Sequence, residues 1–267
     1  MKKVTLILCV KFMAAMMLAS CTGGGTKDEE SPNETTLSNE VTIGEQVWMT
    51  KNLNVSTFRN GDPIPHVKTK DEWVKSRDNK QPAWCYYNND SANGAKYGKL
   101  YNWYAVIDPR GLAPVGYHIP SDAEWTVLTD YLGGEVTAGA KMKNKSGWNS
   151  YMTGGSETCP NCINWNAEYR GKVPCHTCKD TRSVDVPQKS YSGNGTNTSG
   201  FSGLPGGHRL GYSGSFDGIG EYYGFWWSST EDGTTYAWFC GLVYYDGRVI
   251  SSVDSKGNGF SVRCLRD

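Results

Sequence analysis

The chain has 267 residues, with 27 basic and 27 acidic side chains, 10 Trp, 16 Tyr and 32 Gly. A formal net charge of zero leaves no electrostatic footprint for nucleic-acid binding. Abundant Gly, Tyr and Trp with few long apolar runs indicates a loop-rich, β-rich exported domain.

Residues 1–20 have the pattern of a secretory signal peptide. Lys2 and Lys3 precede an apolar run that ends at Leu18-Ala19-Ser20-Cys21, and this run is too short for a stable membrane span. The Leu-Ala-Ser-Cys string resembles the lipobox of bacterial lipoproteins, which implies that Cys21 becomes the lipidated N-terminus. The alternative is an ordinary secreted protein with a chance cysteine.

Residues 21–40 are expected to form a lipidated, flexible tether, because they contain almost no apolar side chains. Thr22 follows Cys21 where an aspartate would resemble an inner-membrane retention signal, so we expect the outer membrane. The run Lys27-Asp28-Glu29-Glu30 resembles a surface-export signal, although a solvated linker explains it equally well. Removal of the three leader lysines from the 27 basic residues leaves 24 against 27 acidic residues, a net charge of −3.

The first elements of the domain are predicted from turn and capping signals. Residues 41–49 read as a short hairpin with a turn at Gly44-Glu45. Residues 97–107 contain apolar side chains at helical spacing. A second helix is expected after Pro120, with Ser121 and Glu124 in capping-box positions and Gly133-Gly134 as its stop.

The C-terminal third is predicted to be an antiparallel meander. Residues 235–245 and 248–253 would be joined by a two-residue turn at Asp246-Gly247. That turn sets Tyr245 opposite Arg248 and Cys240 opposite Val253. Residues 259–265 would then form a last strand, with Phe260, Val262 and Cys264 on one face.

Four cysteines lie in a polar segment at about residues 150–195 that reads as an insertion. They form two C-x2-C pairs separated by twelve residues, a pattern that suits a zinc knuckle with tetrahedral thiolate ligation: Cys159, Cys162, Cys175 and Cys178. We expect one structural zinc here. Disulfides are the main alternative in an exported protein, and a redox role is a third.

The remaining cysteines of the domain are Cys85, Cys240 and Cys264. The predicted register puts Cys264 roughly 13 Å along the strand from Cys240, beyond disulfide reach. Cys240 is therefore expected to be a buried free thiol. Cys85 is left as the only unassigned partner for Cys264.

Several strings together resemble one family, the Fibrobacter succinogenes major paralogous (FISUMP) domain, and they run in the family's order from about Val41 to the end. They are Trp84-Cys85-Tyr86-Tyr87-Asn88-Asn89-Asp90, Tyr97-Gly98-Lys99-Leu100-Tyr101-Asn102-Trp103-Tyr104-Ala105, Gly116-Tyr117-His118-Ile119-Pro120-Ser121-Asp122-Ala123-Glu124-Trp125, Ser199-Gly200-Phe201-Ser202-Gly203-Leu204-Pro205-Gly206-Gly207-His208-Arg209, Trp226-Trp227-Ser228-Ser229-Thr230-Glu231 and Ser261-Val262-Arg263-Cys264-Leu265-Arg266-Asp267.

The resemblance implies one exported domain over residues 41–267 that is often lipid-anchored. It also implies an α+β fold similar to the C-type lectin-like and formylglycine-generating-enzyme group, loop-rich, with short antiparallel strands and, here, two helices. It carries no catalytic residues over. Ala113 stands where the family often has a cysteine, and the cysteine-rich insertion is not typical of the family.

These observations favour a non-enzymatic binding or adhesion module on the cell surface, with a glycan or a host protein as ligand. The expected ligand surface is the loop-rich segment 192–223, with stacking faces from Tyr212, Phe216, Tyr222 and Tyr223. Trp226-Trp227 could also stack on sugar but is expected to be core. The alternative is an exported enzyme of the formylglycine-generating-enzyme fold group, although His118 and His208 read as structural histidines.

Overall fold

The computed structural model describes residues 39–158 and 183–267, without side-chain detail at 154–158 and 183–187. This part of the chain mixes helices and sheets, as an α+β domain does. Its helices are α1 (Lys70–Asp78), α2 (Ser91–Tyr97), α3 (Trp103–Val106), α4 (Asp122–Tyr131) and α5 (Glu135–Met142), with a 3-10 turn at Tyr87–Asn89. The prediction of two helices was therefore too low, because α1, α2 and α5 were missed.

The strands of the described residues form four sheets. A five-stranded sheet has the order β12-β11-β10-β8-β9, a four-stranded sheet has the order β1-β2-β13-β5, and β3-β4 and β6-β7 form two-stranded sheets. Their bounds are β1 Glu40–Ile43, β2 Gln46–Met49, β3 Trp84–Cys85, β4 Leu100–Tyr101, β5 Tyr117–His118, β6 Ser150–Thr158, β7 Ser183–Ser192, β8 Gly206–Arg209, β9 Phe216–Ile219, β10 Tyr223–Asp232, β11 Tyr236–Val243, β12 Val249–Ser255 and β13 Leu265–Arg266.

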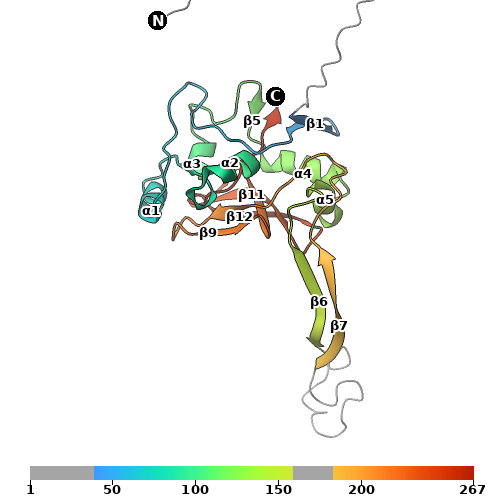
Figure 1. Cartoon of the computed structure of the whole chain (residues 1–267). Coiled ribbons are helices and arrows are strands. Elements are labelled where there is room, and N and C mark those ends of the chain that lie inside the picture. Colours follow the sequence, from blue (N-terminus) through green and yellow to red (C-terminus); the bar gives the residue numbers. More distant parts are fainter. Residues whose placement is uncertain (1–38, 159–182) are drawn as a thin grey trace, which may run out of the picture. The chain divides into compact units, whose positions relative to one another are not determined.

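Helix α4 packs between the two larger sheets (Figure 1). Its Trp125 ring lies 4.7 Å from the Trp48 ring of β2 and belongs to the same buried cluster as Trp226 of β10. Trp227 points into a different cluster, so β10 is buried on both faces. Both Trp226 and Trp227 are fully buried, which confirms that they are core residues.

Two predicted elements are confirmed in detail. The first hairpin pairs Ile43 with Gln46 across the turn at Gly44. Helix α4 has its capping box complete, because the Ser121 side chain accepts from the Glu124 N–H and the Glu124 side chain accepts from the Ser121 N–H. Local chemistry alone determines both features.

The predicted helix over residues 97–107 was wrong over most of its length. Gly98 adopts φ 77° and ψ −160°, which ends α2. Leu100 then pairs with Cys85 as strand β4, and Asn102 caps the one-turn helix α3. The helical spacing of apolar residues arose here from burial on several sides, because Leu100 and Trp103 belong to different core clusters.

The predicted C-terminal register was wrong by two residues. Cys240 lies opposite Ser251, and Leu242 lies opposite Val249, so a longer loop replaces the two-residue turn. The buried ammonium of Lys143 accounts for this loop. It donates hydrogen bonds to the carbonyl oxygens of Val243, Tyr244 and Asp246 at 3.0, 3.4 and 2.9 Å.

The last segment leaves the meander. Phe260 bridges to Tyr101, Ser261 bridges to Trp226, and Leu265 pairs with β2 and β5. Phe260, Val262 and Cys264 nevertheless share one buried cluster, as their alternation predicted. Among the described residues, no helix is long and apolar enough to cross a membrane.

Candidate functional site

A row of tyrosines lies where the β6-β7 hairpin meets the five-stranded sheet. We call it the tyrosine platform and define it as Tyr151, Tyr191, Tyr222, Tyr223, Tyr244 and Tyr245. Each ring has another ring of the platform within 6.3 Å. All six side chains are partly or largely exposed, and Tyr191 and Tyr245 are 38% and 51% accessible.

Strand pairing positions the platform. Tyr151 and Tyr191 are direct partners across β6 and β7, and their rings stack at 5.6 Å. The N–H of Tyr244 donates to the carbonyl of Tyr222 at 3.0 Å, which brings their rings to 5.0 Å. Tyr223 stacks on Phe225 at 5.5 Å. The rings are therefore held by backbone hydrogen bonds before any ligand arrives.

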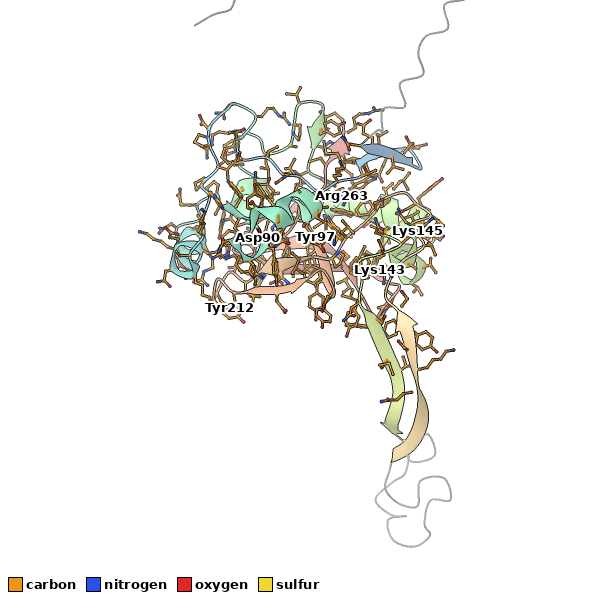
Figure 2. The ribbon with its side chains drawn as sticks, viewed as in Figure 1. Asp90, Tyr97, Lys143, Lys145, Tyr212 and Arg263 are labelled. Atoms are coloured by element: carbon orange, nitrogen blue, oxygen red, sulfur yellow. The ribbon has the colours of Figure 1, made fainter. Side chains whose placement is uncertain are left out.

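The structure places the four predicted ligand residues in different surroundings. Tyr222 and Tyr223 belong to the platform, with rings 6.1 Å apart. Phe216 is half-buried instead, because it packs against Tyr87 at 5.0 Å and under the Arg209 guanidinium. Tyr212 is 71% exposed and lies away from Arg263 and Lys143 in Figure 2.

Sequence reasoning missed four of the six platform tyrosines. Tyr151 and Tyr191 lie in the segment read as an insertion. Tyr244 and Tyr245 were predicted to end a strand and lie instead in the loop after β11. The Tyr244-Tyr245 pair directly before Asp246-Gly247 was the available signal.

His118 is held between two carboxylates. Its Nδ1 lies 2.8 Å from Asp267 Oδ1, and its Nε2 lies 2.9 Å from Glu124 Oε1. Desolvation lowers the pKa of His118, but the hydrogen bonds to Asp267 and Glu124 outweigh it and raise the pKa above its ordinary value. With both ring nitrogens occupied, His118 joins β5 to the α4 cap and to the chain end.

The other histidines of the described residues, His66 and His208, pack on aromatic rings instead. His208 is buried against Phe225 at 5.4 Å, its Nδ1 has no described partner, and desolvation lowers its pKa. His66 stacks on Trp84 at 3.9 Å, and desolvation, with nearby Lys68, lowers its pKa. His176 lies outside the described residues.

The described cysteines are all free and buried: Cys85, Cys240 and Cys264. The expected free thiol at Cys240 is thus present, whereas Cys85 and Cys264 are not joined. Burial raises the pKa of Cys85 and of Cys264 to about 12, so these thiols carry no nucleophilic thiolate at neutral pH.

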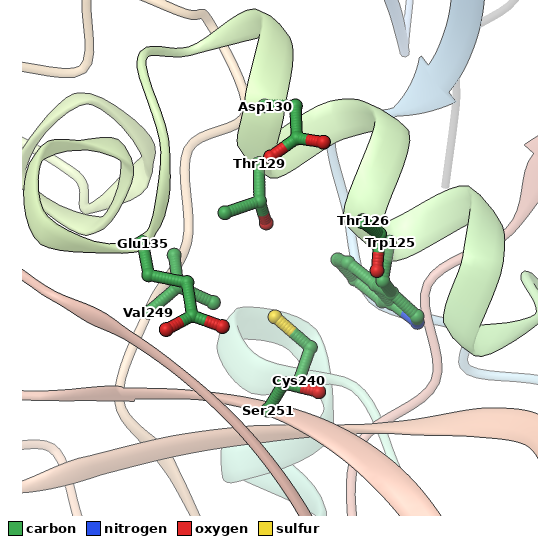
Figure 3. A pocket seen from close by; sticks show the side chains of 8 residues that line it. All are labelled: Trp125, Thr126, Thr129, Asp130, Glu135, Cys240, Val249 and Ser251. Carbon is green, nitrogen blue, oxygen red and sulfur yellow. The ribbon is translucent and has the colours of Figure 1, made fainter.

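Cys240 lies at a small pocket beside α4 (Figure 3). The pocket has a volume of about 40 Å³, which admits water-sized species and excludes a sugar or peptide. Burial raises the pKa of Cys240 strongly. This pocket therefore offers no ligand site.

Three predicted site features lie outside the described residues. These are the lipidation site at Cys21 and the two C-x2-C pairs, Cys159 with Cys162 and Cys175 with Cys178. Within residues 39–158 and 183–267, no group of three His, Cys, Asp or Glu side chains is arranged to hold a metal.

Comparison with known proteins gives one match. A family model described as Fibrobacter succinogenes major domain matches residues 41–266. No curated protein and no solved structure matches the chain significantly.

Proposed function

The chain belongs to the Fibrobacter succinogenes major domain family, and from this premise we propose that it is an exported surface lipoprotein acting as a non-enzymatic binding or adhesion module. Its ligand is a glycan or a protein. In this proposal a lipid anchor at Cys21 holds it at a membrane. Thr22, in place of an aspartate after Cys21, favours the outer membrane, with the domain exposed at the cell surface. We further propose that the domain is of the C-type lectin-like and formylglycine-generating-enzyme-like fold group.

The tyrosine platform carries the proposal. Tyr and Trp side chains offer large, rigid contact area at low conformational cost and stack on sugar faces or on a partner's side chains. On this platform Tyr222 and Tyr244 meet edge to face, so exposed ring surface is already arranged. Binding per molecule would be weak and would gain from many copies on one membrane.

The four cysteines of the insertion are proposed to hold one structural zinc. Elemental analysis of protein purified without chelator should find about one equivalent. If no metal is found and none of the four cysteines can be alkylated under non-reducing conditions, the four cysteines form two disulfides instead.

A glycan and host-protein array tests the proposed function. The mature protein, solubilised in mild detergent, should bind at least one array member. Tyr222→Ala should weaken that binding about tenfold or more, as loss of a stacked aromatic anchor does. Tyr212→Ala tests the other predicted contact in the same assay.

Tyr236→Ala is the matched control, because Tyr236 is a 49% exposed tyrosine outside the platform. It should leave both binding and melting temperature unchanged. If Tyr222→Ala lowers melting temperature and binding together, the platform is structural and the site lies elsewhere.

An exported enzyme is the second candidate, and His118 is the observation that favours it. His118 and Glu124 line an open cleft of about 350 Å³ with Arg59. Turnover of a glycan or peptide that His118→Ala or His208→Ala abolishes would overturn the non-enzymatic proposal. We expect no such turnover, because both His118 ring nitrogens are engaged by carboxylates.

A further inference from the structure

A second, polar cleft lies apart from the tyrosine platform. It has a volume of about 500 Å³, within the range of ligand pockets. Its walls are the loop after β2, the C-terminal half of α2 and two later loops. The lining residues are Thr50, Lys51, Asn52, Asn54, Gly94, Ala95, Lys96, Gly98, Asn144, Ser202 and Leu204. None of them belongs to the platform.

The side chains that line the cleft carry positive charge but no negative charge. The amides of Asn54 and Asn144 and the hydroxyl of Thr50 can supply hydrogen bonds, whereas Asn52 and Ser202 already bond within the protein. Two lysines supply positive charge. No acidic side chain lines the cleft. Such an imbalance is notable in a chain whose basic and acidic residues are equal in number.

Two buried cations stand directly behind the cleft wall. Lys99 Nζ donates to the carbonyl of Asn54 at 2.9 Å, and Arg263 Nη2 donates to Asn52 Oδ1 at 2.6 Å. Lys99 and Arg263 are 4% and 1% exposed, and neither forms an ion pair within the described chain. Asn52 links Arg263 to Tyr97, both labelled in Figure 2, because its Nδ2 donates to the Tyr97 carbonyl.

Arg263 keeps its charge at neutral pH. Desolvation lowers the pKa of Arg263 to about 9, which still leaves its guanidinium protonated. Desolvation also lowers the pKa of Lys99. Because buried charges are poorly screened by solvent, their fields extend to the adjacent cleft.

Two lining side chains are free to engage a ligand. Lys51 and the Asn54 amide have no hydrogen-bond or ion-pair partner among the described residues, and both are exposed. Lys96 lies 4.7 Å above the Tyr97 ring with its ammonium accessible.

We propose that this cleft binds an acidic sugar, in which Lys51 and Lys96 pair with the carboxylate and the Asn54 and Asn144 amides hydrogen-bond the hydroxyls. Carboxylated polysaccharides present such residues in series. A neutral sugar leaves the two lysines without counter-charge. An acidic peptide offers carboxylates but no ring hydroxyls for Asn54 and Asn144.

The test compares one oligosaccharide with and without its charge. Isothermal titration of the full mature protein should show binding of trigalacturonic acid, and its methyl ester should bind at least tenfold more weakly. Affinity should fall as salt rises from 50 to 300 mM, since the contacts involve exposed ammonium groups. Equal binding of acid and ester overturns the proposal, as does absence of binding to the acid.

Matched variants locate the site. Lys51→Gln with Lys96→Gln should lower the affinity for trigalacturonic acid at least tenfold. Lys75→Gln with Lys80→Gln removes the same charge from α1 and the turn after it, and should change affinity less than twofold. Equal losses of affinity in the two double variants would mean that the protein attracts the acid non-specifically, and would overturn the proposed site.

Two further outcomes separate this site from the proposed function. Tyr222→Ala should leave trigalacturonic acid binding unchanged; if it abolishes that binding, the acid sits on the platform, the cleft proposal falls and the proposed function stands. Asn54→Ala should lower the affinity for trigalacturonic acid but leave the affinity for triglutamate unchanged. Tight binding of triglutamate that depends on Lys51 would assign the cleft to acidic peptides and would overturn the proposal that it binds an acidic sugar.

Discussion

Buried cations are a recurring feature of the residues described. Lys99, Lys143, Arg209, Lys256 and Arg263 are all at most 4% exposed. Within residues 39–158 and 183–267, only Lys256 among them pairs with a carboxylate, that of Glu231 at 2.9 Å. The others are satisfied by carbonyl oxygens and aromatic faces, which provide the hydrogen bonds that a buried charge requires.

Arg209 illustrates the arrangement. Its guanidinium donates to the carbonyls of Val67, Lys68, Thr69 and Gly214, and it lies 4.6 Å from the Trp73 ring centroid. One side chain thus joins β8 to the loop before α1. The family string that ends in His208-Arg209 therefore includes a residue that organises the fold.

Asn52 is expected to be the most sensitive single position of the core network. Its Oδ1 accepts from Trp226 Nε1 at 2.8 Å and from the Arg263 guanidinium. Asn52→Ala would leave both donors without this acceptor, so we expect a loss of about 3 kcal/mol in the free energy of unfolding. Urea denaturation measures it.

Asn52→Asp is the informative control. The aspartate keeps an acceptor for Arg263 but loses the Nδ2 donor to the Tyr97 carbonyl. It should therefore cost clearly less than Asn52→Ala. Equal losses would show that packing, and not the acceptor, matters at this position.

His118 predicts a pH dependence of stability. Its folded pKa lies above the ordinary value of 6.5, so the stabilisation is fully present below about pH 6.5 and is lost as pH rises through the folded pKa. For Glu124, desolvation raises the pKa, but hydrogen bonds from Ser121 and His118 outweigh it, so its folded pKa lies below 4.5. The Glu124 contribution is therefore lost as pH falls through that folded pKa.

The measurement is the unfolding free energy of wild type and His118→Gln from pH 5 to 9. The difference between them should be largest near pH 5 to 6 and should shrink towards pH 9. His66→Gln is the control, because the pKa of His66 is lowered instead. A difference independent of pH would contradict the ion-pair role of His118.

At the scale of elements, capping and turn signals were sufficient where the determinants were local. The Ser121 cap and the Gly44 turn depend on neighbours within a few residues, and both were predicted correctly. The register of β11 and β12 depends on Lys143, which lies 100 residues before Val243 and interacts with its carbonyl. The tyrosine platform likewise unites residues from β6, β7 and the ends of β10 and β11, so no local pattern could reveal that these tyrosines come together.

The loop between β11 and β12 provides a test of that account. Lys143→Met keeps a long apolar side chain but leaves the carbonyls of Val243, Tyr244 and Asp246 without their donor. We expect a loss of about 3 kcal/mol in unfolding free energy and faster amide exchange at residues 243–248.

Lys145→Met, at an exposed neighbouring lysine, should change neither quantity. If the amides of residues 243–248 stay protected from exchange in Lys143→Met, the longer turn is stable without the lysine. The misassigned register would then need another explanation.

At the scale of the whole molecule, the start and the end of the domain meet in one sheet. β13 pairs with β2 through Leu265 and Trp48 and with β5 through Leu265 and His118. The chain enters this sheet at β1, which begins at Glu40, the last residue of the predicted tether. Truncation at either end would therefore open the same sheet.

Lipid attachment at Cys21 determines whether this domain acts at a membrane surface. Acyl chains on Cys21 would supply about 0.8 kcal/mol of membrane affinity per buried methylene. Cys21→Ala should therefore move the protein from the membrane fraction to the soluble fraction, or leave the precursor with its leader uncut. Fractionation followed by mass spectrometry of the N-terminal peptide distinguishes these two results.

Cys9→Ala, a substitution of the cysteine within the leader, is the control and should fractionate as wild type. A Cys21→Ala protein that stays in the membrane fraction with the wild-type mass shift would exclude lipidation at this residue and leave the domain an ordinary secreted protein.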